Sequence, residues 1–245
     1  MKKYLPDLLT LSNLMCGVCA AIMALWGLFI EAYCFIMAGA VFDIFDGALA
    51  RRLGVSSPMG RELDSLSDLV SFGLAPSLML FCWYYNINCS GEPHFLAFVP
   101  LLMVAFTSVR LARFNIYQSG DKEFHGLASP ASGILAASAV GYGHCCSMAG
   151  APGAVNALLC SAWFIPALSA ALCILLVCSV RMFSAKSKPG VKHILLGASA
   201  AAIIILELIF APRGLQAAAY AALFTLLLFG CYILISLLPL PSKRD

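Results

Sequence analysis

The chain consists of apolar stretches about as long as a bilayer is thick, separated by short polar breaks. Hydrophobic residues make up 62% of its 245 residues and charged residues 11%, whereas an average soluble domain has about 25% charged residues. A helix crosses a membrane with about 20 apolar residues, and nothing here repeats the alternating pattern of a membrane β-strand. We therefore predict an all-α integral membrane protein that forms a single membrane domain. The eight predicted transmembrane helices cover residues 8–29, 33–50, 62–86, 95–117, 130–148, 157–180, 193–211 and 215–238.

Lysine and arginine fall almost entirely on one side of this predicted topology. If the N-terminus is cytoplasmic, fourteen of the fifteen lie on the inner side and only Arg213 lies outside. Such an excess is typical of cytoplasmic loops. We predict a multi-pass protein of the inner (cytoplasmic) membrane with both termini in the cytoplasm. The net charge of +3 then favours contact with anionic lipid rather than with nucleic acid.

Four aspartates lie close together where the second predicted span ends and the third begins. Asp43 and Asp46 are three residues apart, and Asp64 and Asp68 are four apart, so each pair shares one face of a helix. The predicted topology places both pairs at the cytoplasmic surface. Oxygen ligands without His or Cys suit Mg²⁺, Mn²⁺ or Ca²⁺, and two such ions can stabilise the attacking and leaving oxygens of a phosphoryl transfer. The spacing therefore predicts a site for divalent metal facing the cytoplasm.

Small and basic residues accompany the aspartates. Gly47, Ala50 and Gly60 leave space beside the carboxylates for a ligand, and Arg51 offers a planar double donor to a phosphate. Each also has a purely structural explanation. Gly and Ala commonly provide helix-packing surfaces in membranes, and an arginine at a helix end commonly anchors the interface.

Together these residues form the pattern D-x2-D-G-x2-A-R-x8-G-x3-D-x3-D over positions 43–68. The pattern is identified as the signature of the CDP-alcohol phosphatidyltransferase family, and every fixed position is matched. The resemblance implies an enzyme that moves a phosphatidyl group from a CDP-linked lipid to a small alcohol and releases CMP. It also implies a six-helix core, a homodimer and divalent metal, Mg²⁺ or Mn²⁺ in two sites. The core would occupy about residues 1–182, and 193–238 would add two helices.

Three segments resemble the phosphatidylserine synthase branch of this family: residues 62–76, 110–115 and 124–130. Relatives that use glycerophosphate usually have Pro after the third aspartate and Lys after the fourth, whereas this chain has Ser65 and Leu69. The resemblance implies CDP-diacylglycerol and L-serine as substrates. The chain departs from the common pattern at Asp7 and Ala128, where many members have Asn and Pro; we expect neither departure to affect the chemistry.

The resemblance also implies roles for individual residues. Asp43, Asp46 and Asp64 would hold the metals, CDP-lipid would lie against Gly47, Ala50, Arg51 and Gly60, and Asp68 would be the general base, with a share in metal binding. Arg110 and Arg113, which share a helix face, would bind the serine carboxylate, although interfacial snorkelling is the alternative. Asn115 and Ser71 are weaker candidates for contact with the serine amino group.

Two other functions stay open. Arg110 and Arg113 could instead bind the phosphate of another acceptor, such as glycerol 3-phosphate or inositol phosphate. An ion-coupled transporter could also carry membrane aspartates, but its site usually lies near the midplane on broken helices. Aspartates at the inner interface, with arginines beside them, fit that class poorly.

Overall fold

The computed structural model of the chain describes residues 4–54, 57–89, 91–92, 94–117, 126–150, 154–178, 219 and 222–230. In these residues all regular structure is helical and no strand occurs, which confirms the all-α prediction for this part of the chain. A short helix covers 222–230. The labelled elements are α1 (Leu5–Leu25), α2 (Phe29–Leu53), α3 (Pro58–Asp68), the π-helix η2 (Leu69–Leu74), α4 (Ala75–Asn88), the 3₁₀-helix η3 (Phe95–Leu101), α5 (Leu102–Tyr117), α6 (Ser129–Met148), α7 (Ala154–Leu159) and α8 (Phe164–Val177).

Within the described residues, four helical stretches are long and apolar enough to cross a membrane. They are Leu5–Leu25, Phe29–Leu53, Pro58–Asn88 and Phe95–Ile116, and they match the first four predicted spans. The sixth predicted span is interrupted, because α7 ends at Leu159 and α8 begins at Phe164. Residues 193–211 and most of 215–238 lie outside the described part. The count of eight and the side on which the termini lie therefore stay predictions.

The first turn lies earlier in the chain than the sequence suggested. The predicted spans 8–29 and 33–50 place the break around Glu31, but α1 ends at Leu25 and Glu31 belongs to the first turn of α2. Gly27 makes the reversal with φ 76°, in the left-handed region that glycine adopts without steric cost. The Leu28 N–H then donates to the Met23 carbonyl at 2.9 Å. The apolar residues around Gly27 hid this turn, because they continue the hydrophobic run.

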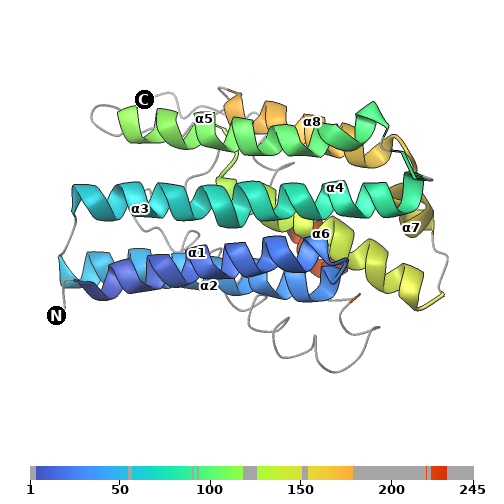
Figure 1. Cartoon of the computed structure of the whole chain (residues 1–245). Helices are drawn as coiled ribbons and strands as arrows, with labels where there is room; N and C mark the ends of the chain where they lie inside the picture. Colours follow the sequence, from blue (N-terminus) through green and yellow to red (C-terminus); the bar gives the residue numbers. More distant parts are fainter. Residues whose placement is uncertain are drawn as a thin grey trace, which may run out of the picture.

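The helices form a bundle with their long axes roughly aligned (Figure 1). α1 and α2 pack side by side, and α3, η2 and α4 form one continuous rod above them, with α5 and α8 on the far side of the rod (Figure 1). The start of α1, the end of α2, the start of α3 and the end of α5 meet at one end of the bundle, on the left in Figure 1. The predicted aspartates therefore come from elements that converge at this end.

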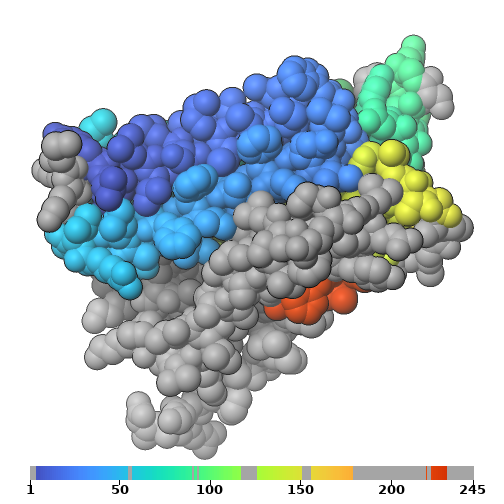
Figure 2. Space-filling view, turned by 90° about the horizontal axis from the view of Figure 1, so that it is seen from below, coloured from blue at the N-terminus to red at the C-terminus, as the bar shows by residue number. Residues whose placement is uncertain are grey.

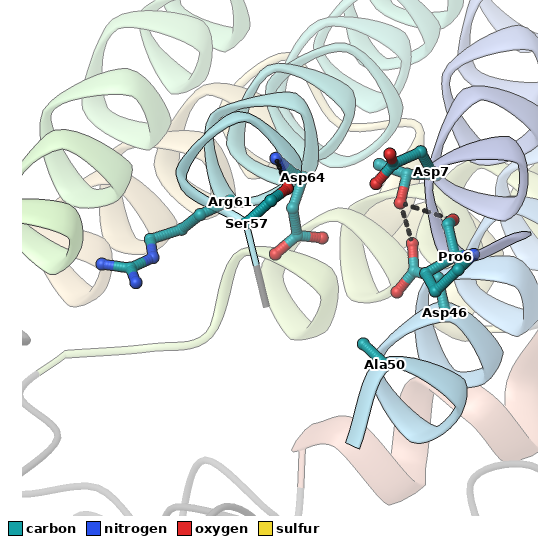
Figure 3. Close-up of a pocket in the computed structure, with 10 residues that line it drawn as sticks. Pro6, Asp7, Asp46, Ala50, Ser57, Arg61 and Asp64 are labelled. Atoms are coloured by element: carbon teal, nitrogen blue, oxygen red, sulfur yellow. Dashed lines mark hydrogen bonds between the residues drawn. The ribbon is translucent and has the colours of Figure 1, made fainter. Parts of the chain in front are cut away.

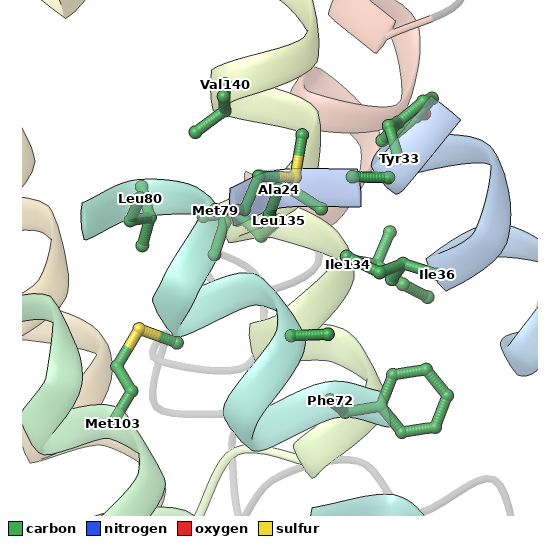
Figure 4. Packing of buried hydrophobic residues seen from close by; sticks show 14 of the residues in the cluster. Ala24, Tyr33, Ile36, Phe72, Met79, Leu80, Met103, Ile134, Leu135 and Val140 are labelled. Atoms are coloured by element: carbon green, nitrogen blue, oxygen red, sulfur yellow. The ribbon is translucent and has the colours of Figure 1, made fainter. Parts of the chain in front are cut away.

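The core lies between these layers. Ile36, Phe72, Met79, Met103 and Ile134 are essentially buried and come from different elements (Figure 4). Fourteen of the twenty residues of α6 are buried, so this helix is surrounded by its neighbours. Most of these residues are small, which lets the other helices approach its backbone closely.

The outer face of α1 is apolar. Leu8, Met15, Ile22 and Leu25 are all well exposed, and Figure 2 shows α1 and α2 running along this side of the molecule. A continuous exposed row of large apolar side chains is costly in water and suits contact with lipid. The row therefore agrees with a multi-pass membrane protein.

The π-helix η2 is held in close contact on two sides. A Cβ at Gly17 of α1 would lie 2.7 Å from the Ser71 Cα, and a Cβ at Gly133 of α6 would lie 2.8 Å from the Phe72 Cα and carbonyl oxygen. Only glycine allows two helices to approach the backbone of η2 so closely. Because η2 starts directly after Asp68, these contacts also fix the position of that carboxylate.

We predict that Gly133→Ala destabilises the protein. The added Cβ would meet backbone atoms of Phe72, which cannot rotate away, so the clash outweighs the better helix propensity of alanine. Overpacking of this kind costs about 1–3 kcal/mol, which corresponds to a fall in Tm of about 2–10 °C. Thermal unfolding in detergent measures the effect. Gly230→Ala is the matched control, since no atom of the described residues lies within 4 Å of its added Cβ; equal Tm values for the two variants would refute the close contact.

Candidate metal centre and adjoining pocket

Three of the four aspartates converge. One carboxylate oxygen each from Asp43 of α2 and from Asp64 and Asp68 of α3 lies within 4.8 Å of the other two. Asp68 is 8% exposed, and the other two are half-buried. Three oxygens at this separation, with no nitrogen or sulfur ligand in the group, fit a hard divalent cation such as Mg²⁺ or Mn²⁺. The three carboxylates are called the aspartate cluster below.

The fourth aspartate is bound by α1. Asp46 is buried and its Oδ2 accepts a hydrogen bond of 2.7 Å from the Thr10 hydroxyl of α1. It is not one of the three clustered carboxylates, but it lines the pocket next to them. The four aspartates therefore divide into a group of three and one carboxylate oriented by α1.

A pocket of about 170 Å³ opens beside the cluster, between the start of α1, the end of α2 and the start of α3. In Figure 3 the Asp46 and Asp64 side chains face this space, whereas the Arg61 side chain extends away from them. The lining residues are Pro6, Asp7, Thr10, Asp46, Gly47, Ala50, Ser57, Gly60, Arg61 and Asp64. Three of the four residues predicted to contact CDP-lipid, Gly47, Ala50 and Gly60, thus line this pocket. The fourth, Arg51, is exposed, and its guanidinium folds back toward Gly47.

Gly60 keeps the α3 side of the pocket open. The Ser57 hydroxyl caps α3 by accepting a hydrogen bond of 2.9 Å from the Gly60 N–H, and Pro58 occupies the first helical position, where a missing N–H is harmless. A Cβ at Gly60 would lie 3.0 Å from the Ser57 Oγ and 3.1 Å from the Asp7 Oδ1. A larger residue would therefore crowd both the helix cap and the side of the pocket formed by α1.

Two serines join the rod to α1 on either side of Asp68. The Ser67 hydroxyl donates to the Thr10 carbonyl at 2.8 Å, and the Ser71 hydroxyl donates to the Asn13 carbonyl at 2.9 Å. Both serines are buried. A buried hydroxyl would lose its water, so these bonds are needed to satisfy it. They fix the register of α3 and η2 against α1, and with it the depth of Asp68.

The residues predicted to bind serine lie in different surroundings. The Arg110 Nη1 donates to the Ser129 Oγ at 2.5 Å and so links α5 to α6. Arg113 is exposed and donates to the Val177 carbonyl at 3.4 Å. The Asn115 amide donates to the Ser65 Oγ at 3.0 Å, which places Asn115 next to the residue that follows Asp64. Ser71 is fully buried in the seam with α1.

The sequence interpretation overlooked the contribution of α1. Asp7 was expected to lie away from the chemistry, but it lines the pocket together with Thr10. A signal was present: Asp7, Thr10 and Asn13 recur every three residues in a stretch that is otherwise apolar except for Ser12, so they lie along one side of the helix. Polar residues on one side of a membrane helix usually face the protein interior.

Comparison with known proteins agrees with this geometry. One relative is the CDP-diacylglycerol–serine O-phosphatidyltransferase of Bacillus subtilis (strain 168), 38% identical over 135 residues, which are 54% of this chain and 72% of the relative. Another is the archaetidylserine synthase of Methanothermobacter thermautotrophicus, 34% identical over 140 residues, which cover 55% of this chain and 56% of the relative. The Saccharomyces cerevisiae CDP-diacylglycerol–serine O-phosphatidyltransferase is 44% identical over 86 residues, 35% of this chain and 29% of the relative. The match thus spans only about half, or less, of several relatives.

The sequence profile of the family described as CDP-alcohol phosphatidyltransferase matches residues 3–149. This range is more than half of the chain and contains α1 to α6, the aspartate cluster and the whole pocket. The chain belongs to the CDP-alcohol phosphatidyltransferase family.

Proposed function

We propose that the protein transfers the phosphatidyl group of CDP-diacylglycerol to the hydroxyl of L-serine, giving phosphatidylserine and CMP. The observation that carries this proposal is the aspartate cluster, with its oxygens within 4.8 Å, beside a pocket lined by Gly47, Ala50 and Gly60. The acceptor is chosen because relatives at 34–38% identity are named for serine transfer.

Asp43, Asp64 and Asp68 would hold one divalent cation, Mg²⁺ or Mn²⁺, and Asp46 with Asp64 would hold a second. A cation bound there neutralises the pyrophosphate of the substrate and the charge of the departing CMP. The hydrogen bond from Thr10 leaves Asp46 with a fixed orientation. A carboxylate held in advance loses little entropy when it binds a ligand.

The pocket would receive the nucleotide part of CDP-diacylglycerol. Gly47, Ala50 and Gly60 give its walls no bulky side chains, so the substrate can approach the backbone of α2 and α3. Arg51 lies at the rim and is exposed, and its guanidinium can form two parallel bonds to a phosphate. The acyl chains would stay in the bilayer beside the bundle.

Asp68 would act as the general base. As the serine oxygen attacks the phosphorus, its proton passes to the Asp68 carboxylate, and the bond from phosphorus to the CMP oxygen breaks. Asp68 is the least exposed member of the cluster, at 8%, and Ser67 holds the adjacent backbone against α1. A fixed, shielded carboxylate suits proton transfer because its geometry is set before the reaction.

Arg110 and Arg113 would bind the serine carboxylate, and Asn115 and Ser71 would contact its amino group. Arg110 is held by Ser129, and Asn115 lies beside Ser65 on α3, so both can be fixed before serine enters. Glycerol 3-phosphate or inositol phosphate is the second candidate acceptor, because the same arginines could bind a phosphate.

The protein would be a homodimer in the inner membrane with its site facing the cytoplasm. The basic residues support this orientation, since Arg51, Arg61 and Arg113 lie at the end of the bundle that contains the cluster. We further propose one domain over 1–245, with the core at about 1–182.

A transporter is disfavoured because Asp64 lies in the second turn of α3 rather than in the middle of a broken helix.

CMP release from CDP-diacylglycerol by the purified protein tests the function. We expect release to depend on L-serine when serine, glycerol 3-phosphate, inositol phosphate and glycerol are supplied in parallel, and to stop in EDTA. Preference for a phosphorylated acceptor would reject the serine assignment. Full activity in EDTA would reject the role of the metal.

The Asp68→Asn variant tests the base. It keeps the size of the side chain and removes the proton acceptor, so kcat should fall by about 100-fold or more while binding of CDP-diacylglycerol stays near the wild-type level. If binding weakens as much as turnover, Asp68 is chiefly a metal ligand and the assignment as base is wrong.

The Thr10→Val variant tests the orientation of Asp46. Valine has the same shape but cannot donate to the carboxylate, and a hydrogen bond to a charged group is worth about 1.5–3 kcal/mol. The KM for CDP-diacylglycerol should rise by about tenfold or more, with little change in the KM for serine. Thr107→Val is the matched control, since Thr107 is fully buried and its hydroxyl has no hydrogen-bond partner among the described residues. A similar KM in both variants would show that the Thr10 bond is dispensable.

Arg110→Gln and Arg113→Gln, made separately, test acceptor binding. Loss of the group that binds the serine carboxylate should raise the KM for serine by about 10- to 100-fold. Ser129→Ala is the control for Arg110, because it breaks the link between α5 and α6 and keeps the guanidinium. If Ser129→Ala raises the KM for serine as much as Arg110→Gln does, Arg110 acts by holding the helices and not by contact with serine.

A further inference from the structure

Asn13 has no role in the mechanism described so far, yet it lies in a demanding position. Its side chain is fully buried in α1. Neither its Oδ1 nor its Nδ2 has a hydrogen-bond partner among the described residues; only its backbone carbonyl is used, by Ser71. Buried amides without partners are rare because each unsatisfied atom costs free energy. Both polar atoms of the amide are therefore available to a ligand.

The neighbours of Asn13 place it about one helical turn from the aspartate cluster. A Cβ at Gly39 of α2 would lie 2.8 Å from the Asn13 Oδ1, and Gly39 precedes Asp43 by one helical turn. The Ser71 hydroxyl bonds to the Asn13 carbonyl at 2.9 Å, and Ser71 follows Asp68 within one turn. Residues three or four apart are stacked on one face of a helix. Asn13 thus lies where α1, α2 and η2 meet, one turn deeper than the carboxylates. We call this position the floor of the site.

The chemistry of an amide limits what can bind at this floor. A carboxamide offers both a donor and an acceptor, and its natural complement is a group that also donates and accepts. Phosphate and carboxylate oxygens only accept, and an ammonium group only donates. A hydroxyl oxygen does both. The position below Asp68 is also where the oxygen that loses its proton to that carboxylate would be needed.

We propose that the Asn13 amide binds a hydroxyl oxygen at the floor of the aspartate cluster. The oxygen belongs either to the acceptor alcohol or to a water molecule that occupies the same place. Gly39 makes the arrangement possible, because alanine there would press on the Oδ1. The proposal rests on the proposed phosphatidyl transfer, but it requires only an alcohol acceptor and not serine in particular.

The Asn13→Leu variant, which keeps the size and removes both polar atoms, is the main test. We expect its Tm to equal or exceed that of wild type, because an apolar side chain suits this buried place. The KM for the acceptor should rise by about tenfold, the thermal shift produced by the acceptor alone should disappear, and the KM for CDP-diacylglycerol should not change. Thr107→Val, which removes a buried hydroxyl on α5 that has no partner in the described part of the chain, is the control and should leave all four values unchanged.

The outcomes separate the two sources of the oxygen. An increased acceptor KM with loss of the thermal shift identifies the hydroxyl of the alcohol. An unchanged acceptor KM, with kcat lowered by about tenfold and slower CMP release in the absence of acceptor, identifies water. Wild-type kinetics in Asn13→Leu, with or without a fall in Tm, overturns the proposal, because the amide is then only structural.

Gly39→Ala provides a second test if Asn13→Leu does not fold. The Gly39→Ala variant keeps the Asn13 amide but displaces it, so it should change the same kinetic constant as Asn13→Leu does. Unchanged kinetics in a folded Gly39→Ala variant contradict the proposal. The acceptor panel on wild type decides separately whether the alcohol is serine. If it is another alcohol, the proposed function fails for serine, and the same measurements with that alcohol still test Asn13.

Discussion

The structure depends on holding three carboxylates close together at the end of an apolar bundle. Asp43, Asp64 and Asp68 present oxygens within 4.8 Å, and like charges at this distance repel strongly where water is scarce. The fold opposes this repulsion because the three carboxylates are attached to only two rigid rods, α2 and the continuous α3–η2–α4. Any loosening between these rods would separate the carboxylates and remove the site for divalent metal.

The register between the rods is set mainly through α1. Thr10 orients Asp46, while its carbonyl and that of Asn13 accept hydrogen bonds from Ser67 and Ser71. Gly17 lets η2 approach the same helix. One side of α1 thus contacts both rods that carry the aspartate cluster. Since its other side is apolar and exposed, α1 connects the lipid-facing surface to the chemistry by rigid packing, with no intervening loop.

The sequence predicted the features that depend on the residue pattern within a single helix. The spacing of Asp43, Asp46, Asp64 and Asp68 predicts which side chains share a face, and the apolar runs predict the helices. Such a pattern does not show how one helix packs against another. The orientation of Asp46 toward Thr10, the place of Asp7 in the pocket and the burial of Ser71 depend on the contact with α1, so they could not be read from spacing alone.

Two departures from the predicted helices lie in apolar stretches. The wide turn of η2 after Asp68 adds no signal to the hydrophobic pattern, because Leu69–Leu74 is apolar throughout except for Ser71. π-Helical turns often occur at functional sites, and here the close contacts of Gly17 and Gly133 stabilise one. The break between α7 and α8 is similarly hidden in an apolar stretch. At η2 tertiary contacts of Gly17 and Gly133 hold the local structure, and hydropathy reports neither departure.

Direct metal binding tests the central claim, that the aspartate cluster is a site for divalent cation. Mn²⁺ binding to purified wild type, Asp43→Asn, Asp64→Asn and Glu62→Gln can be followed by electron paramagnetic resonance without any substrate. Glu62 is exposed and precedes Asp64 by two residues, so its variant controls for the loss of one negative charge nearby. We expect each aspartate variant to weaken Mn²⁺ binding by about tenfold or more and Glu62→Gln to bind like wild type. Equal Mn²⁺ affinity in wild type and Asp43→Asn would contradict the central claim.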